Sequence, residues 1–202
     1  MTEDAALPPR TADISRGTRE TQIQVKLNLD GTGKATFDTP VGFLNHMLDL
    51  LARHALVDLT VRASGDTDVD LHHTTEDIGI CLGQALNEAL GDKAGIARFG
   101  WAAVPMDEAL AQVALDISGR AYLGYRVEFT GEHIGEFETE LVEEFLGGFV
   151  NHSNVTLHVT VPYGTNDHHI AEATFKAVAV ALREAVGRHP RISGTPSTKG
   201  VL

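Results

Sequence analysis

The chain of 202 residues contains little cysteine, few aromatic residues and no long apolar run. Cys81 is the only cysteine, so no disulfide can form within the chain, as is typical of proteins in a reducing cytoplasm. The apolar stretches are short and interrupted by charged residues, so we expect no membrane-spanning segment. The opening stretch, MTEDAALPPR, is acidic and lacks the apolar core of a signal peptide. These absences predict a cytoplasmic protein with no membrane partner.

Positive charge is also scarce, because 16 Lys and Arg residues stand against 28 Asp and Glu residues. The formal net charge of −12 argues against a nucleic-acid partner, since phosphate backbones attract basic surfaces. It does not exclude a small anionic ligand, because a few local Arg and Lys residues can form a pocket. Histidine, by contrast, is abundant: most of the ten histidines fall in or near two segments that resemble each other.

The chain contains an internal duplication. Residues 43–61 align with residues 141–159 at an offset of 98, and after a two-residue deletion the motif HHTTED (72–77) aligns with HHIAEA (168–173). Both motifs lead into segments of helical apolar periodicity. We therefore infer a duplicated supersecondary unit.

Each copy contains strands followed by helices in the same order. The first copy predicts, in order, a strand over 21–31, a short strand over 34–39, a helix from Pro40 to Leu51, a strand over 57–63, and a helix capped by Thr74 or Thr75 and ended by Gly91. The second copy predicts strands over 109–119 and 121–129, a helix over 136–149, a strand over 155–161 and a helix over 171–186. The expected fold class is α+β, with a sheet covered by helices on one face in each half.

The ends of the chain show no such pattern. We expect a flexible N-terminal segment over 1–19, a first half over 20–95, a second half over 96–190 and a Gly/Pro/Ser-rich tail over 191–202. The four parts are expected to form one domain overall.

The two histidine motifs are suited to metal binding. In each, the first histidine and the glutamate are four residues apart and share a helical face, while the second histidine points away. The residues are His72, His73 and Glu76 in the first motif and His168, His169 and Glu172 in the second. Each motif should therefore supply ligands to two different ions, completed by other segments or subunits. Imidazole and carboxylate suit Mn, Fe, Zn or Ni, and without a thiolate Mn(II) is a reasonable expectation.

Two further residues are candidate ligands because of the duplication. His46 lies in the predicted helix upstream of the first motif, and the repeat aligns it with Glu144. A single helical histidine, or a single histidine pair, is often structural. Two copies at matching positions favour the metal-binding interpretation.

The sequence resembles the imidazoleglycerol-phosphate dehydratase family over nearly all of the chain after residue 15. The segments that carry the resemblance are RGTRETQI, GFLNHML, HHTTEDIGICLGQAL, GIARFG, PMDEAL, DISGRAYL, DHHIAEATFKAVAVALR and PSTKGVL. The resemblance implies a duplicated α+β fold related to the second domain of ribosomal protein S5. It also implies a manganese enzyme with two ions per active site, assembled as an octahedral homo-oligomer of twenty-four subunits with active sites at subunit contacts.

The reaction implied by the resemblance is a step of histidine biosynthesis, the loss of water from D-erythro-imidazole-glycerol phosphate to give imidazole-acetol phosphate. The metal ligands carried over are His46, His72, His73, Glu76, His168, His169 and Glu172, with Glu144 standing where many members have a histidine. Glu20 matches the catalytic glutamate that moves a proton. The substrate-binding positions carried over are Arg98, Arg120, Lys176, Ser197 and Lys199, with Gln22 and His54 as further contacts.

Two other functions use the same residues. A dinuclear metallohydrolase would activate water against a phosphate ester, and would release phosphate rather than a ketone. A non-catalytic metal-binding shell would bind metal and tolerate Arg98→Ala and Lys199→Ala, but it leaves the basic residues and the PSTKG segment unexplained.

Overall fold

The computed structural model describes residues 9–202. Its strands are β1 (Thr11–Gly17), β2 (Thr21–Asn28), β3 (Ala35–Asp38), β4 (Asp58–Gly65), β5 (Phe99–Met106), β6 (Ala109–Asp116), β7 (Tyr122–Arg126), β8 (His133–Ile134), β9 (Phe137–Glu138) and β10 (Thr156–Tyr163). Its helices are α1 (Gly42–Ala55), α2 (His72–Leu90), α3 (Leu141–Ser153) and α4 (Asp167–Val186).

The duplication is visible in the sheet topology. One sheet has the order β1-β2-β4-β3 and the other has the order β5-β6-β10-β7. In both sheets the last strand, β3 or β7, runs parallel to its neighbour, while the other pairs are antiparallel. The α+β class and the internal duplication predicted from the sequence are therefore confirmed.

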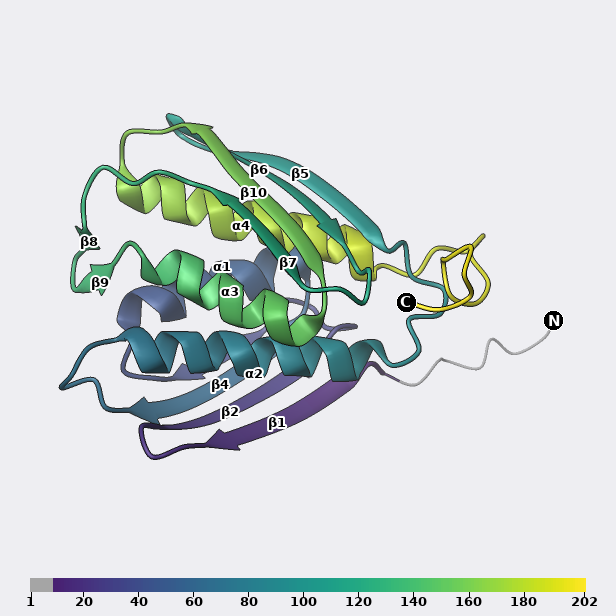
Figure 1. The fold of residues 1–202 in the computed structure, drawn as a ribbon, viewed down its shortest axis with the longest axis horizontal. Helices are drawn as coiled ribbons and strands as arrows, with labels where there is room; N and C mark the ends of the chain where they lie inside the picture. The colour runs from purple at the N-terminus through teal and green to yellow at the C-terminus, as the bar shows by residue number, and fades with distance from the viewer. Residues whose placement is uncertain (1–8) are drawn as a thin grey trace.

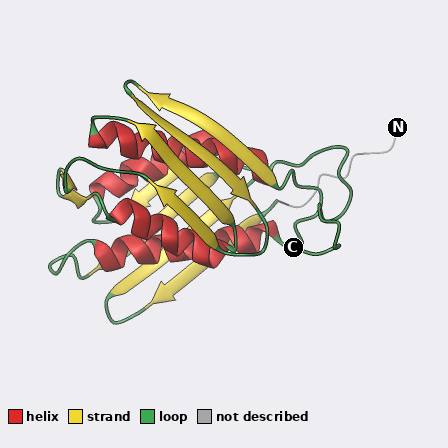
Figure 2. Ribbon diagram, turned by 45° about the horizontal axis from the view of Figure 1, so that its top comes forward, coloured by secondary structure: helices red, strands yellow, loops and turns green. Residues whose placement is uncertain are grey.

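The four helices lie between the two sheets (Figures 1 and 2). Helix α2 covers β1 and β2, α4 covers β5 and β6, and the layers join where α2 packs on α3 and α1 on α4. Alternation in the strands produces this arrangement, since Ile23, Val25 and Leu27 point toward the helices and are buried. The backbones of α2 and α3 approach closely at Gly79, where a Cβ atom would clash with the carbonyl oxygen of Phe145.

The expectation of a flexible segment over residues 1–19 is wrong for residues 11–17, which form β1; residues 1–8 lie outside the described residues. Strand β1 is an edge strand paired only with β2, and within it only Ala12 is fully buried. A short strand with so few buried side chains lacks the regular apolar alternation by which a strand is predicted from sequence. Strand β5 was also missed, because Gly100 and Pro105 interrupt its pattern. An edge strand accommodates such residues.

Two helix starts also differ from prediction. Thr74 and Thr75 are not N-caps of α2, since the helix begins at His72 and buries both threonines. The helix predicted from residue 136 begins at Leu141, because residues 133–138 form the β8–β9 hairpin. Gly91 ends α2 as predicted.

The last helix begins earlier than predicted. Helix α4 starts at Asp167 rather than residue 171, with the Asn166 side chain accepting hydrogen bonds from the N–H groups of His168 and His169. After Val186 the described chain contains no further helix or ladder strand. None of the helices within residues 9–202 has the length and hydropathy needed to cross a membrane.

Candidate metal centre and substrate site

Helices α1 and α4 bring three of the predicted ligands together. His168 Nε2 lies 3.2 Å from Glu172 Oε2, as expected for residues one helical turn apart. His46 Nε2, from α1, lies 3.4 Å from the same oxygen. Within residues 9–202, these three form the one group of at least three such donors whose ligand atoms all lie within 4.8 Å of one another.

Lys176 stabilises the ionised carboxylate of Glu172. Glu172 is only 7% exposed, and Lys176 Nζ lies 2.6 Å from its Oε1. Burial by itself would raise the pKa of Glu172, but the hydrogen bond and the charge of Lys176 lower it overall. Glu172 therefore stays ionised, with Oε2 facing the two imidazoles. Two imidazole nitrogens and one carboxylate oxygen are a donor set that fits a divalent transition-metal ion.

The second histidine of each motif points elsewhere, as predicted. The ring planes of His168 and His169 differ by 83°, and those of His72 and His73 by 84°. Each second histidine has a carboxylate partner: His169 Nδ1 lies 2.7 Å from Glu108 Oε2, and His73 Nδ1 lies 3.0 Å from Asp66 Oδ2. His168 contacts Glu172 within α4, whereas His169 contacts Glu108 from outside the helix, so the two imidazoles of this motif have different partners.

The remaining predicted ligands do not join the three-residue group. They are His72, His73, Glu76, Glu144 and His169. His72 and Glu76 lie in the first turns of α2, and Glu144 lies in the first turn of α3. Helices α2 and α3 pack together as α1 and α4 do, so Glu144 occupies on α3 the position that His46 occupies on α1.

The predicted phosphate-binding residues divide into two sets. The first set, Lys176 and His54, lies near Glu172. Lys176 contacts the Glu172 carboxylate, and burial together with the charges of Lys176 and Arg183 lowers the pKa of His54. By contrast, the backbone N–H of Arg98 donates to the carbonyl of Ala185, at the far end of α4. Arg120, Ser197 and Lys199 belong to this second set, since the loop containing Gly119 packs against the C-terminal Leu202.

Helix α4 separates the two sets. His168 and Ala185 are about 25 Å apart along the helix axis, at a rise of about 1.5 Å per residue. In Figure 1 the tail lies at the end of the molecule opposite the β8–β9 hairpin. A single chain therefore does not bring the tail residues to its own predicted metal ligands.

Arg98 is engaged with the protein itself in this structure. Its Nε lies 2.7 Å from Asp116 Oδ1, and its Nη1 donates to the carbonyl of Pro196 at 2.9 Å. The guanidinium thereby connects β6 to the C-terminal tail. A phosphate would have to share this guanidinium with Asp116.

The two remaining predicted residues lie in the β1–β2 hairpin, Glu20 in its turn and Gln22 in β2. Glu20 is exposed, and among the described residues its carboxylate has no hydrogen-bond partner. Gln22 Nε2 donates to the carbonyl of Thr18 at 3.2 Å. The hydrogen bond that His73 donates to Asp66 raises the pKa of His73, and the nearby charge of Glu20 adds to the effect. Glu20 is therefore close enough to the first motif to influence it.

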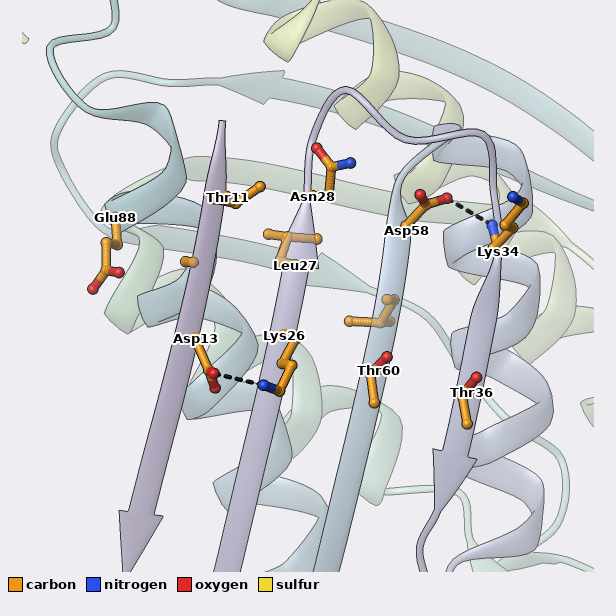
Figure 3. A pocket seen from close by; sticks show the side chains of 12 residues that line it. Thr11, Asp13, Lys26, Leu27, Asn28, Lys34, Thr36, Asp58, Thr60 and Glu88 are labelled. Atoms are coloured by element: carbon orange, nitrogen blue, oxygen red, sulfur yellow. Dashed lines mark hydrogen bonds and ion pairs between the residues drawn. The ribbon is translucent and has the colours of Figure 1, made fainter. Parts of the chain in front are cut away.

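Two cavities differ in their relation to these residues. A cavity of about 420 Å³ adjoins His46 and is lined by Pro40, Phe43 and the β8–β9 hairpin. A groove of about 560 Å³ lies on the outer face of the first sheet, where Asp13 and Lys26 form an ion pair (Figure 3). No predicted site residue lines that groove, so we place the site at the helix ends.

Sequence reasoning missed Asp66 and Glu108. Asp66 follows β4 in a loop and carries no signal of its own. Glu108 could have been found from the duplication. The dipeptide Gln-Val begins four residues after Glu20, at 24–25, and four residues after Glu108, at 112–113.

Comparisons with known proteins agree with this geometry. Residues 39–182 match the family described as imidazoleglycerol-phosphate dehydratase. Curated relatives of that name from Granulibacter bethesdensis and Geobacillus sp. are each 58% identical, over 96% of this chain and 99% of theirs. The Staphylococcus aureus crystal structure of that name has a TM-score of 0.81 and 41% identity, covering 89% of this chain and 99% of its own. A Pyrococcus furiosus structure in complex with (S)-C348 gives 0.80 and 39%, covering 94% and 100%.

Proposed function

The chain belongs to the imidazoleglycerol-phosphate dehydratase family, and from this premise we propose that it dehydrates D-erythro-imidazole-glycerol phosphate to imidazole-acetol phosphate in histidine biosynthesis. The observation that carries the proposal is the convergence of His46, His168 and Glu172 on one point. Such a donor set binds a divalent ion, and an ion there can in turn bind a nitrogen heterocycle such as the imidazole of this substrate.

We propose Mn(II) as the metal, with two ions in each active site. The different partners of the adjacent histidines support two ions, because His168 lies against Glu172 while His169 lies against Glu108. When bound, the ions supply positive charge that polarises the substrate ring and favours loss of its hydroxyl group. The protein keeps Glu172 ionised for this role through Lys176.

Glu20 is the residue that we propose to move the proton. Its carboxylate is exposed and unbound among the described residues, so it can approach and leave the substrate carbon. The carboxylates of Glu76 and Glu172 are less available, since ligation of a metal would occupy their oxygens. Replacing Glu20 should therefore remove turnover while leaving metal binding intact.

The active site is proposed to combine two or more copies of the chain. The separation of about 25 Å along α4 supports this, because the tail cations and the metal ligands of one copy lie at its opposite ends. Arg98, Arg120, Ser197 and Lys199 of one copy would then bind the phosphate of a substrate held at the metal ligands of another. The proposed assembly is the octahedral particle of twenty-four subunits implied by the family resemblance.

The activity is tested by metal removal and replacement. The purified protein is stripped with a chelator, assayed for ketone formation from imidazole-glycerol phosphate, and assayed again after Mn(II) is added back. We expect activity to disappear and return. Release of inorganic phosphate without ketone would instead support a metallohydrolase, and metal binding without turnover would support a non-catalytic shell.

The shared site is tested by mixing two inactive variants. His168→Ala removes a metal ligand and Lys199→Ala removes a tail cation, so each alone should be inactive. When the two chains are dissociated and reassembled together, some sites receive intact ligands from one chain and an intact tail from the other. Recovery of activity supports a site built between copies, whereas its absence in a confirmed mixed assembly contradicts it.

A further inference from the structure

Glu20 and Glu108 occupy the same position of the duplicated unit. Each immediately precedes the second strand of its sheet, β2 or β6, and each is followed by Gln and Val at the same spacing. The two glutamates therefore descend from one ancestral position. Their present environments differ, and this difference indicates separate roles.

Both carboxylate oxygens of Glu108 have hydrogen-bond partners. Its Oε2 lies 2.7 Å from His169 Nδ1, while its Oε1 accepts hydrogen bonds from the backbone N–H groups of Asn166 at 2.8 Å and Thr165 at 3.1 Å. A carboxylate with both oxygens engaged in this way has a defined orientation, so it is well placed to orient the imidazole of His169.

The contact determines which nitrogen His169 can offer to a metal. A carboxylate at Nδ1 holds the proton on that nitrogen, which leaves the lone pair of Nε2 free for coordination. The His169 side chain is partly exposed, and its Nε2 lies 4.0 Å from the exposed carboxylate of Asp107. The ring therefore presents its metal-binding nitrogen at the surface, where another copy would supply the remaining ligands.

The first half achieves the same result with a different residue. Asp66, from the loop after β4, lies 3.0 Å from His73 Nδ1 and occupies the place that Glu108 takes at His169. Glu20 is therefore not needed to orient the second histidine of the first motif. Its carboxylate remains exposed and without a hydrogen-bond partner among residues 9–202.

We propose that Glu108 is a positioning residue that fixes His169 as an Nε2 metal ligand, with Asp66 doing the same for His73. The proposal rests on the proposed metal-dependent function. The duplication thereby produced two descendants of one glutamate: Glu108 orients a ligand, and Glu20 is left free for proton transfer.

The test measures metal affinity rather than turnover. Metal-free protein is titrated with Mn(II), and the free ion is followed by its electron paramagnetic resonance signal. We expect Glu108→Ala to weaken about half of the bound Mn(II) by roughly 10- to 100-fold and to leave the other half unchanged. Glu108→Gln keeps an oxygen acceptor for Nδ1–H and should recover part of the loss.

The matched control is Glu20→Gln at the equivalent position of the first half, which should leave both classes of Mn(II) site unchanged. In addition, Glu108→Ala should add little to His169→Ala, because both act on one ligand. Unchanged Mn(II) affinity in Glu108→Ala would overturn the proposal. Equal weakening of both classes, together with a lower melting temperature of the metal-free protein, would reduce Glu108 to a loop anchor.

These outcomes are distinguishable from failure of the proposed function. A wild-type protein that binds Mn(II) in two classes but forms no ketone would contradict the dehydratase assignment and leave the role of Glu108 intact. A wild-type dehydratase whose Glu108→Ala variant binds Mn(II) normally would do the reverse.

Discussion

The two halves of the molecule share one fold, and each has an arginine at the equivalent position that makes equivalent contacts. Arg10 precedes β1 and Arg98 precedes β5, and each binds a carboxylate through Nε while donating from Nη1 to a distant backbone carbonyl. The carboxylates are Asp30 and Asp116, so the contact survives although the acidic residue has moved. Contacts that hold a half together are therefore retained through duplication, and the proposed phosphate ligand Arg98 also has a scaffold role.

The outer faces of the sheets have diverged, by contrast. Asp13 and Lys34 of the first sheet correspond to Trp101 and Tyr122 of the second, which are 64% and 58% exposed. The first face is a polar groove (Figure 3), while the second carries an aromatic surface. The helices cover only the inner faces, so the fold constrains the inner side chains and leaves the outer ones free to change.

The largest predicted effect concerns the helix ends. Glu172→Gln removes the charge on which His46 and His168 converge, and leaves Lys176 without its partner. We expect dehydratase activity to fall at least about a hundredfold, equivalent to about 3 kcal/mol in the reaction barrier. Steady-state kinetics with saturating Mn(II) measures the loss. Glu76→Gln, at the equivalent position of the first half, should also lose activity, and a fully active variant would show that the two motifs are not equivalent.

The next effect concerns packing of helix on sheet. A Cβ at Gly100 would clash with the carbonyl oxygen of Ala181, whereas the corresponding position of the first half is the buried Ala12. Gly100→Ala should lower the free energy of unfolding by about 1–3 kcal/mol, because β5 or α4 must shift. Ala12→Gly should cost only about 0.5–1 kcal/mol. Denaturant unfolding compares the two, and equal losses would contradict the closer approach in the second half.

Glu144→His would make the halves more alike. The variant gives α3 the residue type that α1 has at His46. If Glu144 is a ligand, the additional imidazole should shift metal preference several-fold toward Zn(II), because imidazole suits Zn(II) while carboxylate suits Mn(II). Competition between the two ions for metal-free protein measures the shift. An unchanged ratio would indicate that residue 144 does not contact the metal.

The smallest effect concerns the Arg10–Asp30 ion pair. The hydrogen bond from Arg10 lowers the pKa of Asp30 below its ordinary value of 3.8, so its contribution to stability is present above that pH. The contribution is lost as the pH falls through the lowered pKa of the folded state. Since the pair is partly exposed, Asp30→Asn should cost less than about 1 kcal/mol at pH 7 and nothing at a pH below the folded pKa. Urea unfolding at both pH values tests this, and a loss that does not depend on pH would exclude the ion pair as its cause.

Much of the fold was predictable because the buried strands alternate regularly. Ile23, Val25 and Leu27 have the period of a half-buried strand, and His168 and Glu172 have that of one helical face. The edge strands β1 and β5 were not predictable in this way. Each pairs with only one neighbouring strand, and most of its side chains are not buried. The partnership of Asp66 with His73 left no trace in the sequence, since it arises where a loop returns to a helix start.

The sequence by itself determined that the chain is duplicated, that each half buries one face of a sheet under helices, and that imidazole and carboxylate recur at helical spacing. These properties depend on local periodicity, which residues close in sequence impose through backbone geometry. Only the tertiary structure decided that His46 meets His168 and Glu172, that Glu108 and Asp66 contact the second histidines, and that the tail lies far from the proposed metal ligands of its own chain. Such contacts join side chains distant in sequence, and they exist only once packing has fixed the positions of helices and loops.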